Sequence, residues 1–297
     1  MNQERAAQNS GRPRWPSAAS RVVGVMGDPV AHSLSPTIHQ AAFEAMGIDW
    51  VSVGFHVTPP RLADAMRGMR GLDVAGMSVT MPHKSAVVAE MDELSSVAAK
   101  LGAVNCITNQ AGRLVGDNTD GEGFLRALAE GTGMDIAGAR CVVIGAGGAA
   151  RAVILALGDV GAAEVAVVNR SADRAASAAR LAGQAGRLGE PEDLYDADLV
   201  VQATPAGMAG VAGVSALPGI PLDALGPGKT VVDIVVNPPE TELVLRARAT
   251  GARAIGGLGM LVHQAAIAIE RWTGTSPPVD AMWKAVDARG ALGGDLR

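Results

Sequence analysis

The strongest constraint on the fold is a glycine-rich turn between two apolar runs. The first run, 141–144 (Cys-Val-Val-Ile), ends at 145–149 (Gly-Ala-Gly-Gly-Ala), and the second spans 165–168 (Val-Ala-Val-Val). The alanine-rich segment between them has helical spacing, which predicts a strand, a tight turn, a helix and a second strand. Glycines let the backbone approach a pyrophosphate, which binds the free N–H groups at a helix N-terminus. The segment therefore predicts a βαβ unit of the dinucleotide-binding type; a turn that only closes a strand onto a helix is the alternative.

The residues after the second apolar run indicate which dinucleotide binds. Folds that prefer NAD place Asp or Glu about 20 residues after the glycines, where it binds the ribose 2′-OH. This chain instead carries Asn169, Arg170, Ser171 and, one turn later, Arg174. A guanidinium binds phosphate through a planar fork of donors, whereas a cation opposes the dipole at a helix N-terminus. The pattern favours NADP over NAD, with two solvated surface arginines as the alternative.

Length and composition define the class of protein. A chain of 297 residues with 48% apolar residues predicts two domains with sizeable cores. The 38 glycines and the aromatic content of only 3% indicate an α/β protein packed with Ala, Val and Leu. The net charge of −5, without a basic block, argues against a nucleic-acid partner. No apolar run reaches the roughly 18 residues of a membrane span, so no membrane partner is expected.

Two further features bear on location and redox state. Residues 1–20 carry three arginines but no apolar core, which predicts a disordered leader instead of a signal peptide. Cys106 and Cys141 fall in separate apolar strands and predict buried thiols in a reducing compartment, with neither a disulfide nor a metal site. We therefore expect a cytoplasmic protein.

The first half of the chain alternates apolar runs with helical segments, which predicts a sheet of its own. Strands are expected at 22–27, 50–57 and 74–80, and helices at 36–45 and 60–69. Ser35 followed by Pro36 predicts a helix N-cap and first helical position. Ser33 has no comparable structural role.

Lys84 follows the third of these strands in the segment Met-Pro-His-Lys. Pro82 predicts a helix start, so Lys84 is expected in the first turn, where the dipole disfavours a cation by about 0.3–1 kcal/mol. This placement indicates a role other than helix stability, with a solvated surface lysine as the alternative. His83 could equally be a packing or capping residue or a catalytic one.

A hairpin at 104–116 then leads to a polar segment at 117–122 (Asp-Asn-Thr-Asp-Gly-Glu). Thr119 and Glu122 match a capping box, and Asp120 would be an acid favoured by the dipole in the first turn. Asn105 lies in an apolar strand, where a buried amide needs hydrogen-bond partners.

The second half continues the pattern of the βαβ unit. Buried strands are expected at 198–202, 230–234 and 252–255, and helices at 260–272 and 280–286. Ligands of open parallel sheets bind beyond the carboxyl ends of such strands. On the first of these helices Gln264 shares a face with Ala268 and Arg271, so an exposed helix glutamine is the alternative to a functional role.

Eight motifs at compatible spacing resemble the shikimate dehydrogenase family from Val22 to Val286. They are Ser-x-Ser at 33–35, Val-Thr-x-Pro-x-Lys at 79–84, Ala-Val-Asn at 103–105, Asp-Asn-Thr-Asp-Gly at 117–121, the glycine turn at 145–149, Asn-Arg-Ser-x-x-Arg at 169–174, Ala-Thr-Pro at 203–205, and Gly-x-Gly-Met-Leu-x-x-Gln at 257–264. The resemblance implies NADP-dependent, reversible reduction of 3-dehydroshikimate to shikimate, in the pathway to chorismate and the aromatic amino acids.

The resemblance also implies an organisation and a set of site residues. Residues 21–120 would form an α/β substrate-binding domain, 121–260 a Rossmann-like doubly wound NADP domain, and 261–297 helices that return to the first domain. The catalytic pair would be Lys84 and Asp120. Substrate would be bound by Ser33, Ser35, Thr80, Lys84, Asn105, Asp120 and Gln264. NADP would be bound by Gly145, Ala146, Gly147, Gly148, Ala149, Asn169, Arg170, Ser171, Arg174, Thr204, Ile234, Gly257 and Met260. The protein is expected to be a monomer or a homodimer.

Two positions depart from the pattern of many members of the family. Ser78 stands where many have Asn, and Val236 stands where many have Tyr. These two residues leave open a substrate other than shikimate, namely quinate or aminoshikimate. An NAD-using quinate dehydrogenase is the nearest alternative to a shikimate dehydrogenase. A non-catalytic NADP-binding regulator is the alternative from another class, and the intact Lys84 and Asp120 argue against it.

Overall fold

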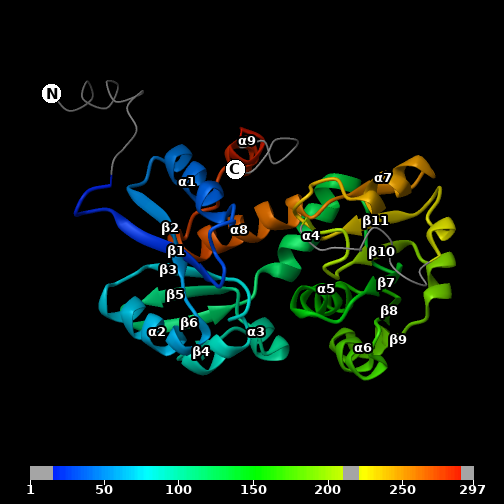
Figure 1. The fold of residues 1–297 in the computed structure, drawn as a ribbon, viewed down its shortest axis with the longest axis horizontal. Helices are drawn as coiled ribbons and strands as arrows, with labels where there is room; N and C mark the ends of the chain where they lie inside the picture. Colours follow the sequence, from blue (N-terminus) through cyan, green and yellow to red (C-terminus); the bar gives the residue numbers. More distant parts are fainter. Residues whose placement is uncertain (1–15, 210–220, 289–297) are drawn as a thin grey trace.

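The computed structural model describes residues 16–209 and 221–288, which build two six-stranded sheets. Figure 1 shows the sheets in separate halves of an elongated molecule. The helices α4 (Asp120–Thr132) and α8 (Leu258–Thr273) pack against each other between the two halves.

The first sheet is mixed. Its strands in spatial order are β2 (Trp50–His56), β1 (Arg21–Gly27), β3 (Gly76–Val79), β5 (Cys106–Gln110), β6 (Arg113–Asp117) and β4 (Glu93–Leu94). The pairs β1–β2 and β1–β3 are parallel, whereas β5 is antiparallel to β3 and to β6, because a tight hairpin joins β5 to β6.

Helices cover both faces of this sheet. One face packs against α1 (Ser35–Met46), α8 and α9 (Val279–Ala288), so the C-terminal helices return to the first half of the chain as the resemblance implied. The other face packs against α2 (Leu62–Gly71) and the 3-10 helix Ala86–Glu90, and the exposed 3-10 helix Pro59–Arg61 directly precedes α2. The short α3 (Ser96–Leu101) lies beside the second half.

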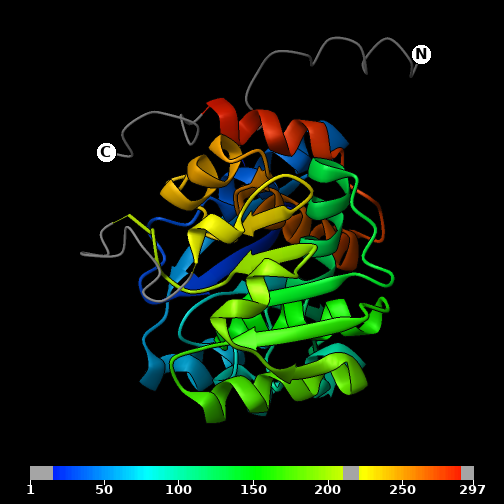
Figure 2. The same ribbon diagram turned by 90° about the vertical axis from the view of Figure 1, so that its right-hand side faces the viewer.

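The second sheet is entirely parallel. Its strands in spatial order are β12 (Arg253–Ile255), β11 (Thr230–Asp233), β10 (Leu199–Gln202), β7 (Arg140–Ile144), β8 (Glu164–Val168) and β9 (Gly186–Leu188). This is the strand order of the Rossmann fold, with its switch point between β7 and β10. Figure 2 faces this half and shows its strands side by side in a twisted sheet.

Helices lie on both faces of the second sheet, as in a doubly wound fold. One face is covered by α4, α5 (Gly148–Asp159), α6 (Ala172–Ala179) and the 3-10 helix Arg180–Ala185. The other is covered by α7 (Glu242–Ala249) and the 3-10 helices Pro191–Tyr195 and Leu222–Ala224. The predicted fold class is therefore confirmed.

Of three helix starts predicted from local signals, two are wrong, and the third lies where predicted but lacks its side-chain cap. The N-cap of α1 is Leu34, and Ser35 is its first residue. Thr119 precedes α4, but its side chain does not cap the helix. Lys84 lies in a turn ahead of the 3-10 helix Ala86–Glu90 and is not in a first helical turn.

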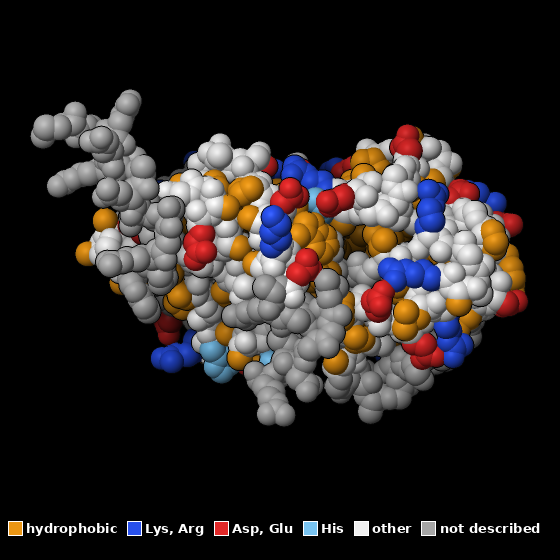
Figure 3. All heavy atoms as spheres, turned by 90° about the horizontal axis from the view of Figure 1, so that it is seen from above, with side chains coloured by type: hydrophobic (Ala, Val, Ile, Leu, Met, Phe, Trp, Pro, Cys, Tyr) orange, Lys and Arg blue, Asp and Glu red, His pale blue; other side chains and the backbone are white. Residues whose placement is uncertain are grey.

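Some predictions concern residues outside the described ranges. These are residues 1–15 of the expected leader and the C-terminal residues 289–297. Residues 16–20 of the expected leader are described, and the Ser20 hydroxyl donates to Asp49 Oδ1 at 2.6 Å. None of the helices in the described ranges combines the length and the apolar character that crossing a membrane requires. Figure 3 shows acidic and basic side chains interspersed on the described part of one face.

Candidate active site

A cavity of about 200 Å³ lies between the two halves of the molecule. The first sheet contributes the ends of β1 and β3, the second contributes the start of α5 and the loop after β11, and α8 closes one side. All seven residues predicted to bind substrate line it: Ser33, Ser35, Thr80, Lys84, Asn105, Asp120 and Gln264. The structure thus brings together side chains that come from five separate sequence motifs.

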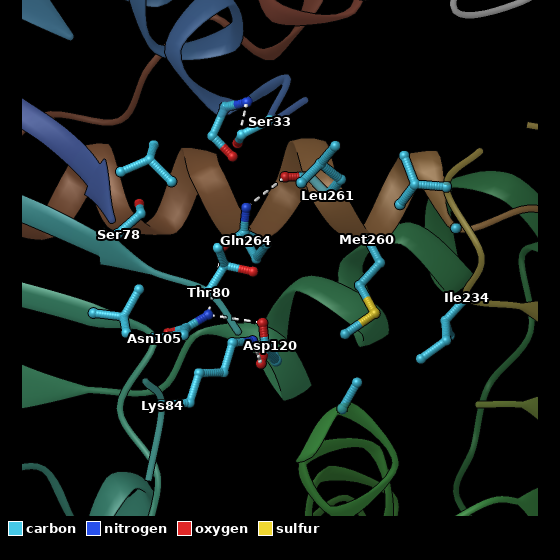
Figure 4. A pocket seen from close by; sticks show the side chains of 16 residues that line it. Ser33, Ser78, Thr80, Lys84, Asn105, Asp120, Ile234, Met260, Leu261 and Gln264 are labelled. Carbon is cyan, nitrogen blue, oxygen red and sulfur yellow. Dashed lines mark hydrogen bonds and ion pairs between the residues drawn. The ribbon is translucent and has the colours of Figure 1, made fainter. Parts of the chain in front are cut away.

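Lys84 and Asp120 form an ion pair at this cavity. Lys84 Nζ lies 2.6 Å from Asp120 Oδ2, and the side chains are 25% and 7% exposed. Asn105 Nδ2 donates to the other carboxylate oxygen at 2.7 Å. The pair therefore combines a proton donor with a mostly buried carboxylate at the cavity (Figure 4).

The backbone around Lys84 is fixed by its neighbours. The Lys84 carbonyl accepts from the Val104 amide at 2.8 Å, next to Asn105. His83 is buried, and its Nε2 lies 2.6 Å from the Val57 carbonyl oxygen. Of the two roles left open for His83, the structure favours packing, because the buried ring holds the turn that presents Lys84 and does not line the cavity.

A buried amide network connects the polar end of the cavity to α8. The Asn105 side-chain oxygen accepts from the Thr119 amide at 2.8 Å, and Thr119 Oγ1 donates to the Gln264 carbonyl at 3.1 Å. Because the Thr119 hydroxyl is used across the interface with α8, the predicted capping box with Glu122 does not form. Gln264 is buried and lines the cavity, so the alternative of an exposed helix glutamine is wrong. Its Nε2 donates to the Leu261 carbonyl at 2.9 Å.

Hydroxyl groups form another part of the cavity lining. Ser33 Oγ accepts from the Ser35 amide at 3.3 Å, so Ser33 also has a local role that the sequence did not indicate. Ser78 lines the cavity, and its buried Oγ has no hydrogen-bond partner among the described residues. Val236 presents an apolar wall. Both positions that depart from the family pattern therefore lie at the site.

Sequence reasoning missed three apolar residues of the lining, namely Val25, Val79 and Leu261. No signal in the sequence distinguishes such residues from the core, since apolar side chains are expected at all three positions.

The glycine turn leaves room for a ligand. Gly145 has a φ of +119°, and a Cβ there would come within 2.7 Å of the Ala203 carbonyl oxygen, so this position requires glycine. A Cβ on Gly147 or Gly148 would meet no described atom within 4 Å. The N-cap of α5 is Gly147, which offers no side chain to the first amides of the helix. Free amides with open space before them fit the pyrophosphate of a dinucleotide.

The predicted cofactor residues occupy two places. Ala149, Ile234, Gly257 and Met260 line the cavity, close to the catalytic pair. The others do not line it and lie around the carboxyl ends of the second sheet: Gly145, Ala146, Gly147, Gly148, Asn169, Arg170, Ser171, Arg174 and Thr204. This distribution fits an extended ligand with one end at the cavity.

The segment after β8 presents two cations. Ser171 caps α6 and accepts from the Arg174 amide, and Asn169 Nδ2 donates to the Ser171 carbonyl at 3.1 Å. Arg170 and Arg174 are exposed, and neither forms an ion pair with any residue in the described ranges. Since β7 and β8 are parallel neighbours, these arginines lie at the same sheet edge as the glycine turn. Their unpaired guanidiniums suit a 2′-phosphate.

The two cysteines are free and buried. Burial raises the pKa of the Cys106 thiol above its ordinary range and that of Cys141 to about 12, which disfavours the reactive thiolate. Among the described residues, no group of three His, Cys, Asp or Glu is placed to hold a metal ion.

Three family models match successive parts of the chain. The "shikimate dehydrogenase substrate binding domain" matches residues 25–107, the "shikimate / quinate 5-dehydrogenase" model matches 127–219, and the "shikimate 5'-dehydrogenase C-terminal domain" matches 257–286. A shikimate dehydrogenase (NADP(+)) of Methanopyrus kandleri is 44% identical over 279 residues, which cover 91% of this chain and 96% of the relative.

Two solved structures with the same fold are named for different substrates, shikimate and quinate. Shikimate 5-dehydrogenase of Thermus thermophilus in complex with NADP(H) and shikimate superimposes with a TM-score of 0.83 and 37% identity, covering 92% of this chain and all of that one. A quinate dehydrogenase of Corynebacterium glutamicum in complex with NAD has a TM-score of 0.82 and 31% identity, covering 91% and 99%.

Proposed function

The chain belongs to the shikimate dehydrogenase family, and on this premise we propose that it reduces 3-dehydroshikimate reversibly to shikimate, in the pathway to chorismate. The observation that carries the proposal is the Lys84–Asp120 pair, 2.6 Å apart in a cavity that extends to the start of α5. The enzyme is NADP-dependent, as are the relatives that match it along their length.

NADP would be held by the residues that the sequence predicted. The free amides after Gly147 would bind the pyrophosphate, and Arg170 and Arg174 would bind the 2′-phosphate. When bound, NADPH supplies the hydride for the ring carbonyl carbon. Ile234, Gly257 and Met260 form the cavity wall on the cofactor side.

Lys84 and Asp120 would act on the ring oxygen. As the carbonyl carbon is reduced, its oxygen would gain negative charge and take a proton, and Lys84, which lines the cavity, can supply both a proton and an opposing charge. Asp120 would orient the lysine and accept a hydrogen bond from a ring hydroxyl. In the oxidative direction the same proton returns to Lys84.

The other polar residues would orient the ring. Asn105 and Gln264 would bind hydroxyl groups near the catalytic pair, and Ser33, Ser35 and Thr80 would bind the remaining hydroxyl groups and the carboxylate. The domain limits at 21–120, 121–260 and 261–297, the monomeric or homodimeric state and a cytoplasmic location belong to the same proposal.

A two-by-two assay tests the function. Purified protein is given shikimate or quinate, each with NADP or NAD, and dinucleotide reduction is followed at 340 nm. We expect the highest kcat/KM with shikimate and NADP, because Asn169 and Arg170 stand where an NAD-binding acid would be required. A preference for quinate with NAD would identify the rival dehydrogenase, and no turnover with tight NADP binding would identify a regulator.

A further inference from the structure

Three buried polar side chains meet at the carboxyl ends of β10 and β11. Gln202, Asp233 and Thr241 are each 1% exposed. Asp233 Oδ1 accepts from Gln202 Nε2 and from the Val235 amide, both at 3.1 Å. Asp233 Oδ2 accepts from Thr241 Oγ1 at 2.6 Å. One carboxylate thus connects the end of β10, the loop after β11 and the start of α7.

Gln202 extends this network into the loop after β10. Its Nε2 also lies within hydrogen-bond distance of the carbonyls of Thr204 and Ala206, at 3.2 and 3.0 Å. Its side-chain oxygen accepts from the Thr204 amide. The loop that carries Thr204 is therefore folded around a side chain whose position depends on Asp233.

The network reaches the cavity through the two residues after Asp233. Ile234 lines the cavity, and the Val235 carbonyl accepts from the Gly257 amide at 3.0 Å. A Cβ on Gly257 would come within 2.2 Å of the Ile234 carbonyl oxygen, so α8 begins in direct contact with this loop. Figure 4 shows Ile234 beyond Met260 at one end of the cavity, with Ser78 and Asn105 at the other.

Stability alone is a poor reason for this arrangement. Burial raises the pKa of the Asp233 carboxyl, and the hydrogen bonds from Thr241, Val235 and Gln202 oppose that effect. A buried charged group that recovers its desolvation cost through hydrogen bonds adds little net stability compared with apolar packing. What the carboxylate does provide is a fixed geometry for three chain segments.

We propose that Asp233, with Gln202 and Thr241, is a positioning residue that holds the cofactor-side wall of Ile234, Gly257 and Met260 in register with Lys84 and Asp120. The inference rests on the proposed function, because it assigns that wall to hydride transfer. Asp233 does not line the cavity and acts only through the segments that it holds.

The test removes the Asp233 carboxylate in two variants and compares them with two control variants on the same strand. Asp233→Ala deletes all three hydrogen bonds, whereas Asp233→Asn keeps the shape, one accepting oxygen and an amide that can donate to Thr241. Val231→Ala removes buried apolar volume from β11 without touching the network. Thr230→Val removes a buried hydroxyl that has no partner in the described ranges.

Four readouts are measured on each variant: melting temperature, the dissociation constants of NADP and of shikimate, kcat, and the primary deuterium isotope effect with shikimate labelled at the oxidised carbon. In Asp233→Ala we expect kcat to fall roughly 10- to 100-fold, because small misplacements far from the chemistry have effects of this size. The isotope effect should rise and NADP should bind more weakly, while shikimate affinity stays near normal. Asp233→Asn should recover most of the loss.

A readout without turnover separates this inference from the proposed function. Amide hydrogen exchange of the unliganded protein should accelerate at 234–241 and at 203–206 in Asp233→Ala but not in Thr230→Val. If Val231→Ala of similar melting temperature shows the same kinetic losses, the network only stabilises the fold and the inference fails. If Asp233→Ala does not fold, Thr241→Val against Thr241→Ser provides the same comparison. A wild-type protein without shikimate turnover would overturn the proposed function instead.

Discussion

Lys84 Nζ lies 2.6 Å from Asp120 Oδ2, although 36 positions separate the two residues in the chain. Lys84 lies in the turn after β3, and Asp120 is the first residue of α4. The hairpin of β5 and β6 returns the chain to the end of β3 and so brings the two together. The pair is thus a consequence of the topology of the first sheet, and it stands at the boundary with the second half of the molecule.

Replacing Lys84 by Ala should lower kcat and kcat/KM by similar factors. If the lysine stabilises charge that develops only during hydride transfer, its loss affects the transition state and leaves ground-state binding nearly unchanged. A single general acid–base group contributes about 10²- to 10⁴-fold, which is the expected loss. Steady-state kinetics and a separate shikimate dissociation constant measure the two effects.

Lys100→Ala is the matched control for this prediction. Lys100 is an exposed lysine of α3 that pairs with Asp159 at 3.4 Å and does not line the cavity. Near-normal kcat in Lys84→Ala, or a loss confined to shikimate affinity, would make Lys84 a binding residue and remove it from the chemical step.

Replacing Asp120 by Asn should reduce both rate and affinity. The amide removes the charge that faces Lys84 and gives up one accepting oxygen, and the same carboxylate is proposed to accept a ring hydroxyl. Hydrogen bonds that involve a charged group contribute about 1.5–3 kcal/mol, so shikimate should bind roughly 10- to 100-fold more weakly. Glu122→Gln, two residues along the same helix and exposed, should leave both constants unchanged. Unaltered shikimate affinity in Asp120→Asn would contradict the binding role.

The sequence predicted well what local patterns determine. The apolar runs and the glycine turn predicted the strands β7 and β8 with α5 between them, and the structure confirms this unit. Its parallel pairing follows from the helix that crosses between the strands. The family motifs predicted seven residues that bind substrate, and all seven line one cavity.

Predictions from neighbouring residues failed where a side chain contacts a residue that is distant in the chain. The Thr119 hydroxyl does not cap α4, because it donates to the carbonyl of Gln264, 145 positions away. Gln264 is buried because α4 packs on its face of α8, so closely that a Cβ on Gly123 would lie 2.7 Å from the Gln264 Cβ. Helical periodicity alone cannot show that a second helix covers the polar side.

His39 should make the protein less stable in acid. It is fully buried in α1, beside Trp272 at a ring distance of 5.1 Å, and burial lowers its pKa from 6.5 to about 3. Between these two values the unfolded chain binds a proton that the folded protein does not, so stability rises with pH across this window. At pH 5 the residue should cost about 2 kcal/mol relative to pH 7.

Urea unfolding at pH 7 and pH 5 measures this effect. His39→Gln cannot titrate but keeps a group that can bond the Ser52 hydroxyl, which lies 2.9 Å from His39 Nδ1. The difference in unfolding free energy between the two pH values should therefore be smaller in the variant than in the wild type. An unchanged difference would show that His39 is protonated in the folded protein at pH 5.

Arg170→Asp should shift the cofactor preference away from NADP. Arg170 follows β8, is exposed, and makes no ion pair within the described ranges, so its guanidinium is available to a ligand. Only NADP carries a 2′-phosphate, and losing a hydrogen bond to a charged group costs about 1.5–3 kcal/mol, or roughly 10- to 100-fold in KM. The new carboxylate would in addition repel that phosphate and could accept from the 2′-OH of NAD. We therefore expect KM for NADP to rise while KM for NAD stays the same or falls.

Arg180→Asp provides the same change of charge at the far end of α6, where the exposed Arg180 follows the last helical residue. It should leave both Michaelis constants close to those of the wild type. The eight residues of α6, or about 12 Å of helix, separate Arg180 from the start of α6, which lies at the same sheet edge as the glycine turn. Measuring both constants for both variants at two salt concentrations separates a local phosphate contact from a general loss of positive charge. An equal rise of KM for NADP and for NAD in Arg170→Asp would show that the arginine supports the fold of the segment after β8 and does not bind the 2′-phosphate.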